Sequence, residues 1–336
     1  MATTHVHDLP TPALLIDVDV LDHNLATMAA ARPGATLRPH VKAHKCTALA
    51  AAQVAAGHRT FTCATPREVI GMAEAGVGDD LLLANETLDP HRLAGMAACQ
   101  STVRITVAVD SPETVDAAAG AGIADVLIDV DIGLPRCGCP PEDAGHLADL
   151  ARRRGLNVRG TMGYEGHLMI VEDRESQRRK VERAIEVLLA AHADVGGEIV
   201  SSGGTGTYDI HPQTTEVQAG SYALMDTAYS KMHLPFRQAC TILGTVIHAD
   251  AHRAVADVGL KAQGMDHGNP QIEGADVLFC SDEHVTFVPH VGVATVGERV
   301  QVVPAHIDPT MAMHHVAWLV RGTEVLDRWP IDLRGW

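Results

Sequence analysis

Short apolar runs alternate with amphipathic or alanine-rich stretches from about residue 12 to about residue 230. The stretch 175–192 is the clearest helix, because its apolar side chains fall at i, i+3, i+4, i+7 and i+8. These side chains are Val181, Ala184, Ile185, Leu188 and Leu189. Strands that alternate with helices predict βαβ units and a parallel sheet. About eight such units in roughly 220 residues favour a (β/α)8 barrel, with a doubly wound open sheet as the alternative.

The expected elements divide the chain into two domains. Strands are expected at 14–20, 36–41, 60–63, 81–84, 103–109, 126–130, 158–162, 199–202 and 216–224, and helices at 46–56, 67–75, 112–119, 141–154 and 175–192. After about residue 235, short β-like runs at 240–248, 254–258, 277–279, 284–287 and 299–303 are separated by polar loops with Gly, Asp and Asn. We therefore predict an α/β barrel over 10–235 and a mostly antiparallel β domain over 236–336, which the N-terminal strand is a candidate to join.

Composition removes several classes of function. With 26 basic and 42 acidic side chains the net charge is −16, which argues against a nucleic-acid surface or an anionic-membrane surface. Seven scattered cysteines form a poor disulfide framework, and the start of the chain has no basic segment typical of a signal peptide. No run reaches the roughly 18 apolar residues of a membrane span. We expect a cytoplasmic protein that binds neither nucleic acid nor membrane.

Lys42 is the first candidate for chemistry. It lies in the segment RPHVKAHK (38–45), at the end of an expected barrel strand. Catalytic groups of such barrels follow the carboxyl ends of strands, and a desolvated lysine is a nucleophile and Schiff-base former. The alternative is that Lys42 and Lys45 are solvated loop residues.

Two later loops predict an anion site. The segment VSSGGTGT (200–207) follows a strand directly, and QAGSY (218–222) ends the next loop. Glycine lets backbone N–H groups approach an anion, and hydroxyls add donors. The first segment lacks the Lys of a P-loop. By our count these loops follow the seventh and eighth strands, where phosphate sites are frequent in barrels.

His306 and Asp308 are candidate metal ligands. On an extended segment, residues two apart point the same way, so one imidazole and one carboxylate could hold a divalent cation. Such pairs also arise by chance in a chain with 20 His. Arg136 and Tyr164 each follow a strand, and each is either a site residue or a solvated loop residue.

Together these segments resemble the D-threonine aldolase and D-serine dehydratase family, which belongs to the alanine-racemase-like pyridoxal phosphate (PLP) enzymes. The ordered matches run from TPALLIDVDVLDHNL through RPHVKAHK, IDVDIGLPRCG, GTMGYEGH, SSGGTGTY and QAGSYALMD to HID. The resemblance implies a PLP-binding barrel, a C-terminal β domain and a homodimer.

The resemblance also implies residue roles. Lys42 is similar to the Schiff-base lysine, Arg136 to the residue near the PLP phenolic oxygen, and His306 with Asp308 to the metal pair. The phosphate cup is expected at Gly204, Thr205, Gly206, Gly220 and Ser221, with Tyr164 and Tyr222 lining the cofactor.

The expected function is that of a lyase. In the dehydratase branch the second metal ligand is usually Cys, whereas this chain has Asp308, which favours Mn²⁺ or Mg²⁺ over Zn²⁺. We therefore expect an aldolase that cleaves a D-3-hydroxy amino acid, such as D-threonine, D-phenylserine or 3-hydroxy-D-aspartate, to glycine and an aldehyde. A dehydratase acting on D-serine or 3-hydroxyaspartate is the alternative. A protein that only carries PLP is a third reading, and it would have little use for the metal pair.

Overall fold

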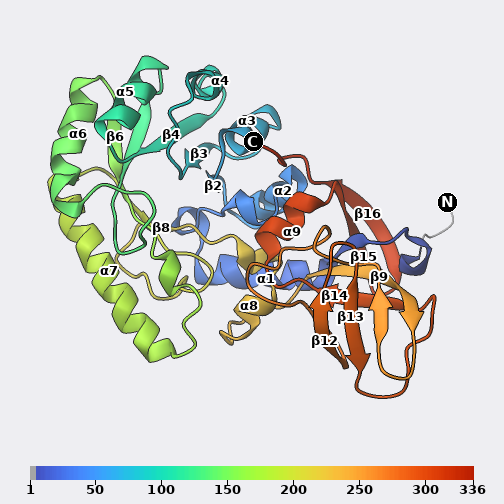
Figure 1. Cartoon of the computed structure of the whole chain (residues 1–336). Coiled ribbons are helices and arrows are strands. Elements are labelled where there is room, and N and C mark those ends of the chain that lie inside the picture. The colour runs from blue at the N-terminus through green and yellow to red at the C-terminus, as the bar shows by residue number, and fades with distance from the viewer. Residues whose placement is uncertain (1–4) are drawn as a thin grey trace. The chain divides into compact units, whose positions relative to one another are not determined.

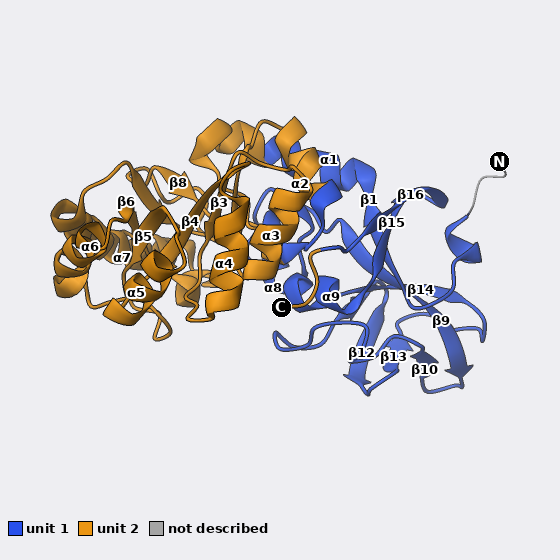
Figure 2. Cartoon of the chain, turned by 90° about the horizontal axis from the view of Figure 1, so that it is seen from above, with its two compact units in different colours: residues 1–27, 43–48, 221–332 blue, residues 28–42, 49–220, 333–336 orange. Residues whose placement is uncertain are grey.

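The structure is a computed structural model that describes residues 5–336 (Figure 1). It contains two compact units, which are coloured separately in Figure 2. Unit 1 comprises residues 1–27, 43–48 and 221–332, and unit 2 comprises 28–42, 49–220 and 333–336. These boundaries differ from the two ranges predicted from the sequence. Among the described residues, no helix combines the length and the apolar composition that crossing a lipid bilayer requires.

Unit 2 is a closed barrel of parallel strands. Seven strands pair in chain order, and they are β2 (Thr60–Cys63), β3 (Asp80–Leu83), β4 (Arg104–Val109), β5 (Asp125–Asp129), β6 (Asn157–Met162), β7 (Ile199–Ser202) and β8 (Glu216–Val217). The segment 37–40 closes the ring, because Leu37 bridges Val217 and His40 bridges Thr62, both in parallel. The prediction of a (β/α)8 barrel is confirmed.

Helices follow the strands and pack on their outer face (Figure 1). They are α2 (Thr47–Ala55), α3 (Pro66–Glu74), α4 (Pro90–Cys99), α5 (Pro112–Gly120), α6 (Ala144–Arg153) and α7 (Arg174–Val195). Three begin with Pro at a position where no amide donor is needed, and the side chains of Thr65, Asp89 and Ser111 cap their first turns. Local sequence therefore sets the start of each of these helices.

The amino ends of the barrel strands carry a buried ion-pair network. The Arg38 guanidinium, 2% exposed, lies 2.8 Å from Glu216 and 3.2 Å from Asp80. Arg159 contacts the same Asp80 at 2.8 Å and Glu198 at 2.9 Å. The two neighbouring carboxylates outweigh the effect of burial and raise the pKa of Arg38 further above its ordinary value. This end of the barrel is thus filled by paired charges rather than by apolar side chains.

Unit 1 is built on a nine-stranded sheet with the order β10-β13-β12-β11-β14-β9-β1-β15-β16. Its strands are β1 (Ala13–Asp17), β9 (Cys240–Ala249), β10 (Ala254–Ala256), β11 (Gln271–Ile272), β12 (Ala275–Cys280), β13 (Val285–Pro289), β14 (Arg299–Val303), β15 (Val316–Arg321) and β16 (Glu324–Pro330). All neighbours are antiparallel except β1 and β15. The antiparallel C-terminal domain is confirmed, and the N-terminal strand β1 lies in its sheet. Helices α1 (Val18–Ala31), α8 (Thr227–Ser230) and α9 (Ile307–Met313) complete the fold.

Several local expectations were wrong. The strand expected at 36–41 is reduced to bridges at 37 and 40, since Pro39 between them has no N–H for a ladder. The strand expected at 216–224 ends at Val217, and Ser221–Ala223 form a 3-10 turn. The hairpin of β15 and β16 and the helix α9 were not predicted.

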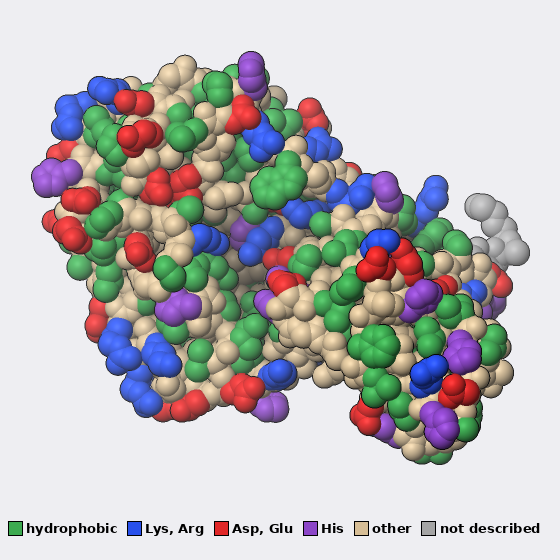
Figure 3. Space-filling view, viewed as in Figure 1, with side chains coloured by type: hydrophobic (Ala, Val, Ile, Leu, Met, Phe, Trp, Pro, Cys, Tyr) green, Lys and Arg blue, Asp and Glu red, His purple; other side chains and the backbone are tan. Residues whose placement is uncertain are grey.

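On the face shown in Figure 3, acidic and basic side chains are interspersed.

Candidate functional site

Parallel strands of a closed barrel present all their carboxyl ends at one mouth, so residues that follow different strands converge there. Seven of the predicted site residues meet this condition within unit 2. Lys42 follows segment 37–40, Arg136 follows β5, Tyr164 follows β6, Gly204, Thr205 and Gly206 follow β7, and Gly220 follows β8. The barrel topology therefore gathers the predicted lysine and most of the predicted phosphate cup at one end.

Lys42 is held in a short 3-10 turn, Val41–Ala43. Its neighbour Val41 is fully buried and fixes the turn against the core, while Lys42 itself is partly exposed. The Lys42 amide lies 3.5 Å from Nδ1 of His40. The backbone around the lysine is thus anchored, and its long side chain starts at the mouth.

Arg136 and Tyr164 lie together at this mouth. The Arg136 guanidinium carbon is 5.6 Å from the centre of the Tyr164 ring, within the range of a cation–π contact. The loop that carries Arg136 is tied to β5, because the Asp131 amide donates to the Cys139 carbonyl and the Cys139 amide to the Asp129 carbonyl, both at 2.9 Å. The two predicted side chains therefore form one contact.

An acidic cluster beside this loop was not predicted. Burial, followed by the nearby Glu86 carboxylate, raises the pKa of Asp129 well above its ordinary value. Burial and Glu86 also raise the pKa of Cys137 to about 11. Ligand atoms of Glu86, Asp110 and Cys137 lie within 4.8 Å of one another.

The loop after β7 packs so closely that it requires glycine. A Cβ on Gly206 would lie 1.9 Å from the Met169 carbonyl oxygen, and one on Gly204 would lie 2.7 Å from the Met169 sulfur. The Gly206 carbonyl accepts from Arg174 Nη1 at 2.6 Å and from Gln177 Nε2 at 3.2 Å. No partner for the Gly206 amide is found in residues 5–336. This loop is a rigid cradle with a backbone donor available to a ligand.

Two buried residues beneath that loop were missed by the sequence reasoning. The Glu165 carboxylate accepts hydrogen bonds from Ser202, Gly203 and Thr207, and it lies 2.8 Å from Nε2 of His211. Burial acts to raise the pKa of Glu165, but its bonds to His211 and Thr207 outweigh burial and lower it to about 2. The signal that could have found Glu165 is its place next to Tyr164, directly after a barrel strand.

The other predicted site residues belong to unit 1. Ser221 and Tyr222 lie in the 3-10 turn Ser221–Ala223. The Ser221 hydroxyl donates to Oδ1 of Asp308 at 3.3 Å. The Tyr222 ring packs at a tilt against Phe236, with 5.6 Å between ring centres. The structure thus connects one expected phosphate ligand to one expected metal ligand.

The geometry expected for the metal pair was wrong. His306 is extended and bridges Gly264, but it is the N-cap residue of α9, and Asp308 lies in the first turn of that helix. The helix starts here because Asp226 accepts from the Ile307 amide at 3.0 Å. The two side chains are therefore not neighbours on one face of a strand.

His306 has partners that were not predicted. Its Nδ1 lies 2.7 Å from Oδ2 of Asp266, and its ring stacks on His267 with 3.9 Å between centres. Ligand atoms of these three residues lie within 4.8 Å of one another. Among the described residues, the clusters of three or more potential metal ligands are this one and the Glu86 group, and Asp308 belongs to neither.

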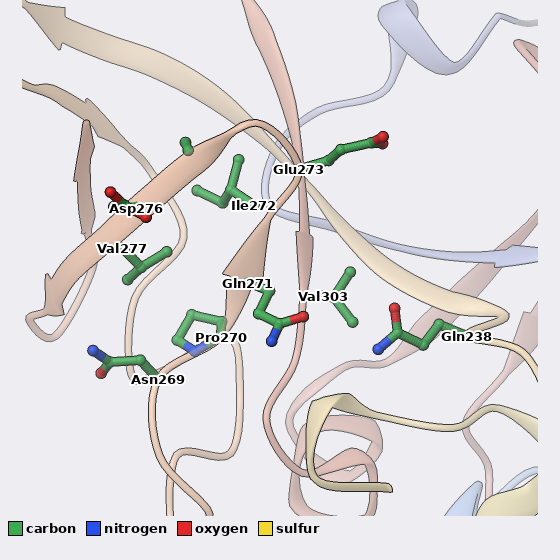
Figure 4. A pocket seen from close by; sticks show the side chains of 10 residues that line it. Gln238, Asn269, Pro270, Gln271, Ile272, Glu273, Asp276, Val277 and Val303 are labelled. Atoms are coloured by element: carbon green, nitrogen blue, oxygen red, sulfur yellow. The ribbon is translucent and has the colours of Figure 1, made fainter. Parts of the chain in front are cut away.

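A cavity of about 680 Å³ lies elsewhere in unit 1 (Figure 4). It is lined by Gln238, Asn269, Pro270, Gln271, Ile272, Glu273, Ala275, Asp276, Val277 and Val303. In Figure 4, Val303 lies between the amide side chains of Gln271 and Gln238. None of the predicted site residues lines this cavity.

Comparison with known proteins gives full-length matches. Residues 16–228 match the family described as the alanine racemase N-terminal domain, and residues 239–320 match a putative serine dehydratase domain. The chain is 34% identical to a D-threonine aldolase of Arthrobacter, over 97% of this chain and 93% of that protein. It is 31% identical to a 3-hydroxy-D-aspartate aldolase of Paracoccus denitrificans, over 98% and 93%. The crystal structure of D-threonine aldolase from Filomicrobium marinum superposes with a TM-score of 0.93 at 32% identity, over 99% and 97% of the two chains.

Proposed function

Since this chain belongs to the alanine-racemase-like family of PLP enzymes, together with the D-threonine aldolases, we propose that it is a PLP- and metal-dependent aldolase. It cleaves a D-3-hydroxy amino acid between Cα and Cβ, and it releases glycine and an aldehyde. D-threonine, D-phenylserine and 3-hydroxy-D-aspartate are the substrates of this type. The observation that carries the proposal is the convergence of Lys42 with the glycine loop after β7 at one barrel mouth.

The residues at the mouth fit PLP. Lys42 would hold the cofactor carbonyl carbon, and Arg136 would lie near the phenolic oxygen beside Tyr164. The Gly204–Gly206 cradle, with its available Gly206 amide, suits a phosphate, and Gly220, Ser221 and Tyr222 complete the proposed set. When bound, PLP supplies an electron sink for negative charge at Cα. The role of the protein is to orient the substrate and to exclude water.

A divalent metal fits the donors at His306 and Asp308. The Asp266 carboxylate holds Nδ1 of His306, which leaves Nε2 for an ion, and carboxylates commonly fix metal-bound histidines in this way. One imidazole and one carboxylate favour Mn²⁺ or Mg²⁺, with Zn²⁺ as the alternative. Such an ion would polarise the β-hydroxyl of the substrate. Because Asp266 and His267 form a cluster of potential metal ligands with His306, both are also candidate ligands.

A dehydratase is the second candidate function, because residues 239–320 match a putative serine dehydratase domain. In that reaction Cα loses its proton and the β-hydroxyl leaves, which gives a 2-oxo acid and ammonia. Asp308, where that branch usually has Cys, favours the aldolase. We also propose a homodimer and a cytoplasmic location, which stay predictions.

A product assay separates the two reactions. Purified protein loaded with PLP and Mn²⁺ is given D-threonine, with L-threonine and the Lys42→Ala variant as controls. Glycine and acetaldehyde in equal amounts support the aldolase. 2-Oxobutyrate and ammonia would assign the dehydratase. No product from D-threonine, D-serine or 3-hydroxyaspartate would refute both.

A further inference from the structure

A buried carboxylate, that of Glu165, lies beneath the proposed phosphate cup, and the proposed reaction gives it no role. We infer that Glu165 is a positioning residue: together with Thr207 and His211 it fixes the Gly203–Thr207 loop in the conformation that binds the PLP phosphate. The inference rests on the proposed function, because it presumes that this loop holds that phosphate.

The first step is that Glu165 determines which way the early amides of the loop point. Its Oε2 accepts the Gly203 amide at 3.1 Å and the Ser202 hydroxyl at 2.9 Å. Gly203 has φ +84°, a turn that an L side chain rarely adopts, and a Cβ there would lie 2.9 Å from Nε2 of His211. The Gly203 N–H is therefore directed into the core.

The second step is a relay through Thr207. The Thr207 hydroxyl donates to Oε1 of Glu165 at 2.7 Å, so its oxygen is left as the acceptor for the Gly204 amide at 3.3 Å. Thr207 also closes the turn, because its own amide donates to the Gly204 carbonyl at 3.2 Å. Both ends of the loop thus depend on one carboxylate.

The third step concerns charge. An anion beneath a phosphate site would repel the ligand, so it must be satisfied locally. Four donors surround Glu165, and the pKa of this group, lowered to about 2, keeps it ionised. His211 is fully buried, and its Nδ1 has no hydrogen-bond partner in residues 5–336. Nε2 of His211 lies 2.8 Å from Oε1 of Glu165 and 3.0 Å from the Thr207 hydroxyl, so both of its contacts are with residues that hold the loop.

The amide that remains for a ligand is that of Gly206. The Gly203, Gly204 and Thr207 amides are engaged, whereas the Gly206 amide has no partner in the described chain and its carbonyl is held by Arg174 and Gln177. Releasing Glu165 frees the inward amides and lets the cradle rotate. Affinity for the phosphate should then fall, while the reaction of Lys42 with an aldehyde is unaffected.

The test compares two aldehydes that differ only in the phosphate. Apo-protein is titrated with PLP and with pyridoxal, and the absorbance of the lysine-bound cofactor gives both dissociation constants. Glu165→Gln puts an NH₂ where two donors converge, and we expect its PLP affinity to fall at least tenfold while pyridoxal affinity stays within twofold. Thr207→Val should behave in the same way, and Thr207→Ser should restore the wild-type ratio.

Glu216→Gln is the matched control, since it also alters a buried glutamate of unit 2 but lies at the amino ends of the strands. It should lower the melting temperature and leave the ratio of the two affinities unchanged. An unchanged ratio in Glu165→Gln refutes the inference. If that variant does not fold, the Thr207 variants provide the test. An unchanged ratio of PLP to pyridoxal affinity in Thr207→Val, or a ratio in Thr207→Ser that differs from wild type, then refutes the inference. If wild-type protein binds PLP no better than pyridoxal, the proposed phosphate site is refuted. If it binds neither, the proposed cofactor is refuted. Both results are distinct from a refutation of the role of Glu165.

Discussion

Arg38→Met should destabilise the protein strongly, because it leaves a buried carboxylate without its cation. Arg38 is 2% exposed and Glu216 6%, with 2.8 Å between their charged atoms. Asp80 keeps a second cation, since Arg159 contacts it at 2.8 Å. The loss is therefore dominated by Glu216, and removal of one partner from a buried pair costs about 3–5 kcal/mol.

A double-mutant cycle separates this cost from the loss of packing. Arg38→Met, Glu216→Gln and the double variant are unfolded in urea and followed by circular dichroism. In the double variant no Glu216 charge is stranded, so we expect it to be more stable than Arg38→Met, with a coupling of about 2–3 kcal/mol. Arg59→Met is the control, because Arg59 and its partner Asp79 are both more than half exposed, and solvent screens such a pair so that its loss should cost far less. An Arg38→Met loss no larger than that of Arg59→Met, or additive single effects, would refute the reasoning.

Four further predictions concern the proposed site. Lys42→Ala should abolish the absorbance of the lysine-bound cofactor and all turnover, and retention of both would remove the cofactor assignment. Gly206→Ala should weaken PLP at least tenfold, since its Cβ would lie 1.9 Å from the Met169 carbonyl, whereas Gly120→Ala has open space and should bind normally. The Glu165 pKa falls from 4.5 to about 2 on folding, so its stabilisation of about 3 kcal/mol is complete above about pH 5 and is lost as the pH falls through 2. Acid titration of unfolding in Glu165→Gln should lack this component. His306→Ala should keep PLP and lose aldol cleavage, and full activity of the wild type in a chelator would exclude the metal.

The barrel could be predicted because its signals are local. Its strands read as short apolar runs, and Pro66, Pro90 and Pro112 mark helix starts that depend on neighbouring residues alone. Segment 37–40 shows the limit, since Pro39 interrupts the ladder although the segment still closes the ring. The missed hairpin of β15 and β16 had a usable sequence signal, because Gly322 stands between two β-rich runs, and its φ of +57° is one that glycine adopts readily in such turns.

The supporting residues of the site could not be predicted in the same way. His211 contacts Glu165 across 46 positions, and Asp266 contacts His306 across 40. No periodicity links such pairs, so only the folded chain shows them. The candidate residues Lys42 and the loop glycines could be proposed from the sequence because they follow expected strands.

Asp308 shows how the backbone geometry expected from a short motif can be wrong. The alternation rule places His306 and Asp308 on one face only if the segment stays extended. The Asp226 carboxylate instead accepts a hydrogen bond from the Ile307 amide, and a helix starts there. Pro309 is tolerated in the first turn of this helix because no amide donor is needed at that position. The distant Asp226 thereby sets the start of the helix, and Asp266 holds Nδ1 of the His306 imidazole at 2.7 Å. Asp266→Asn should consequently weaken Mn²⁺ binding, measured by calorimetry on the PLP-loaded protein, and unchanged affinity would mean that the contact does not support the metal.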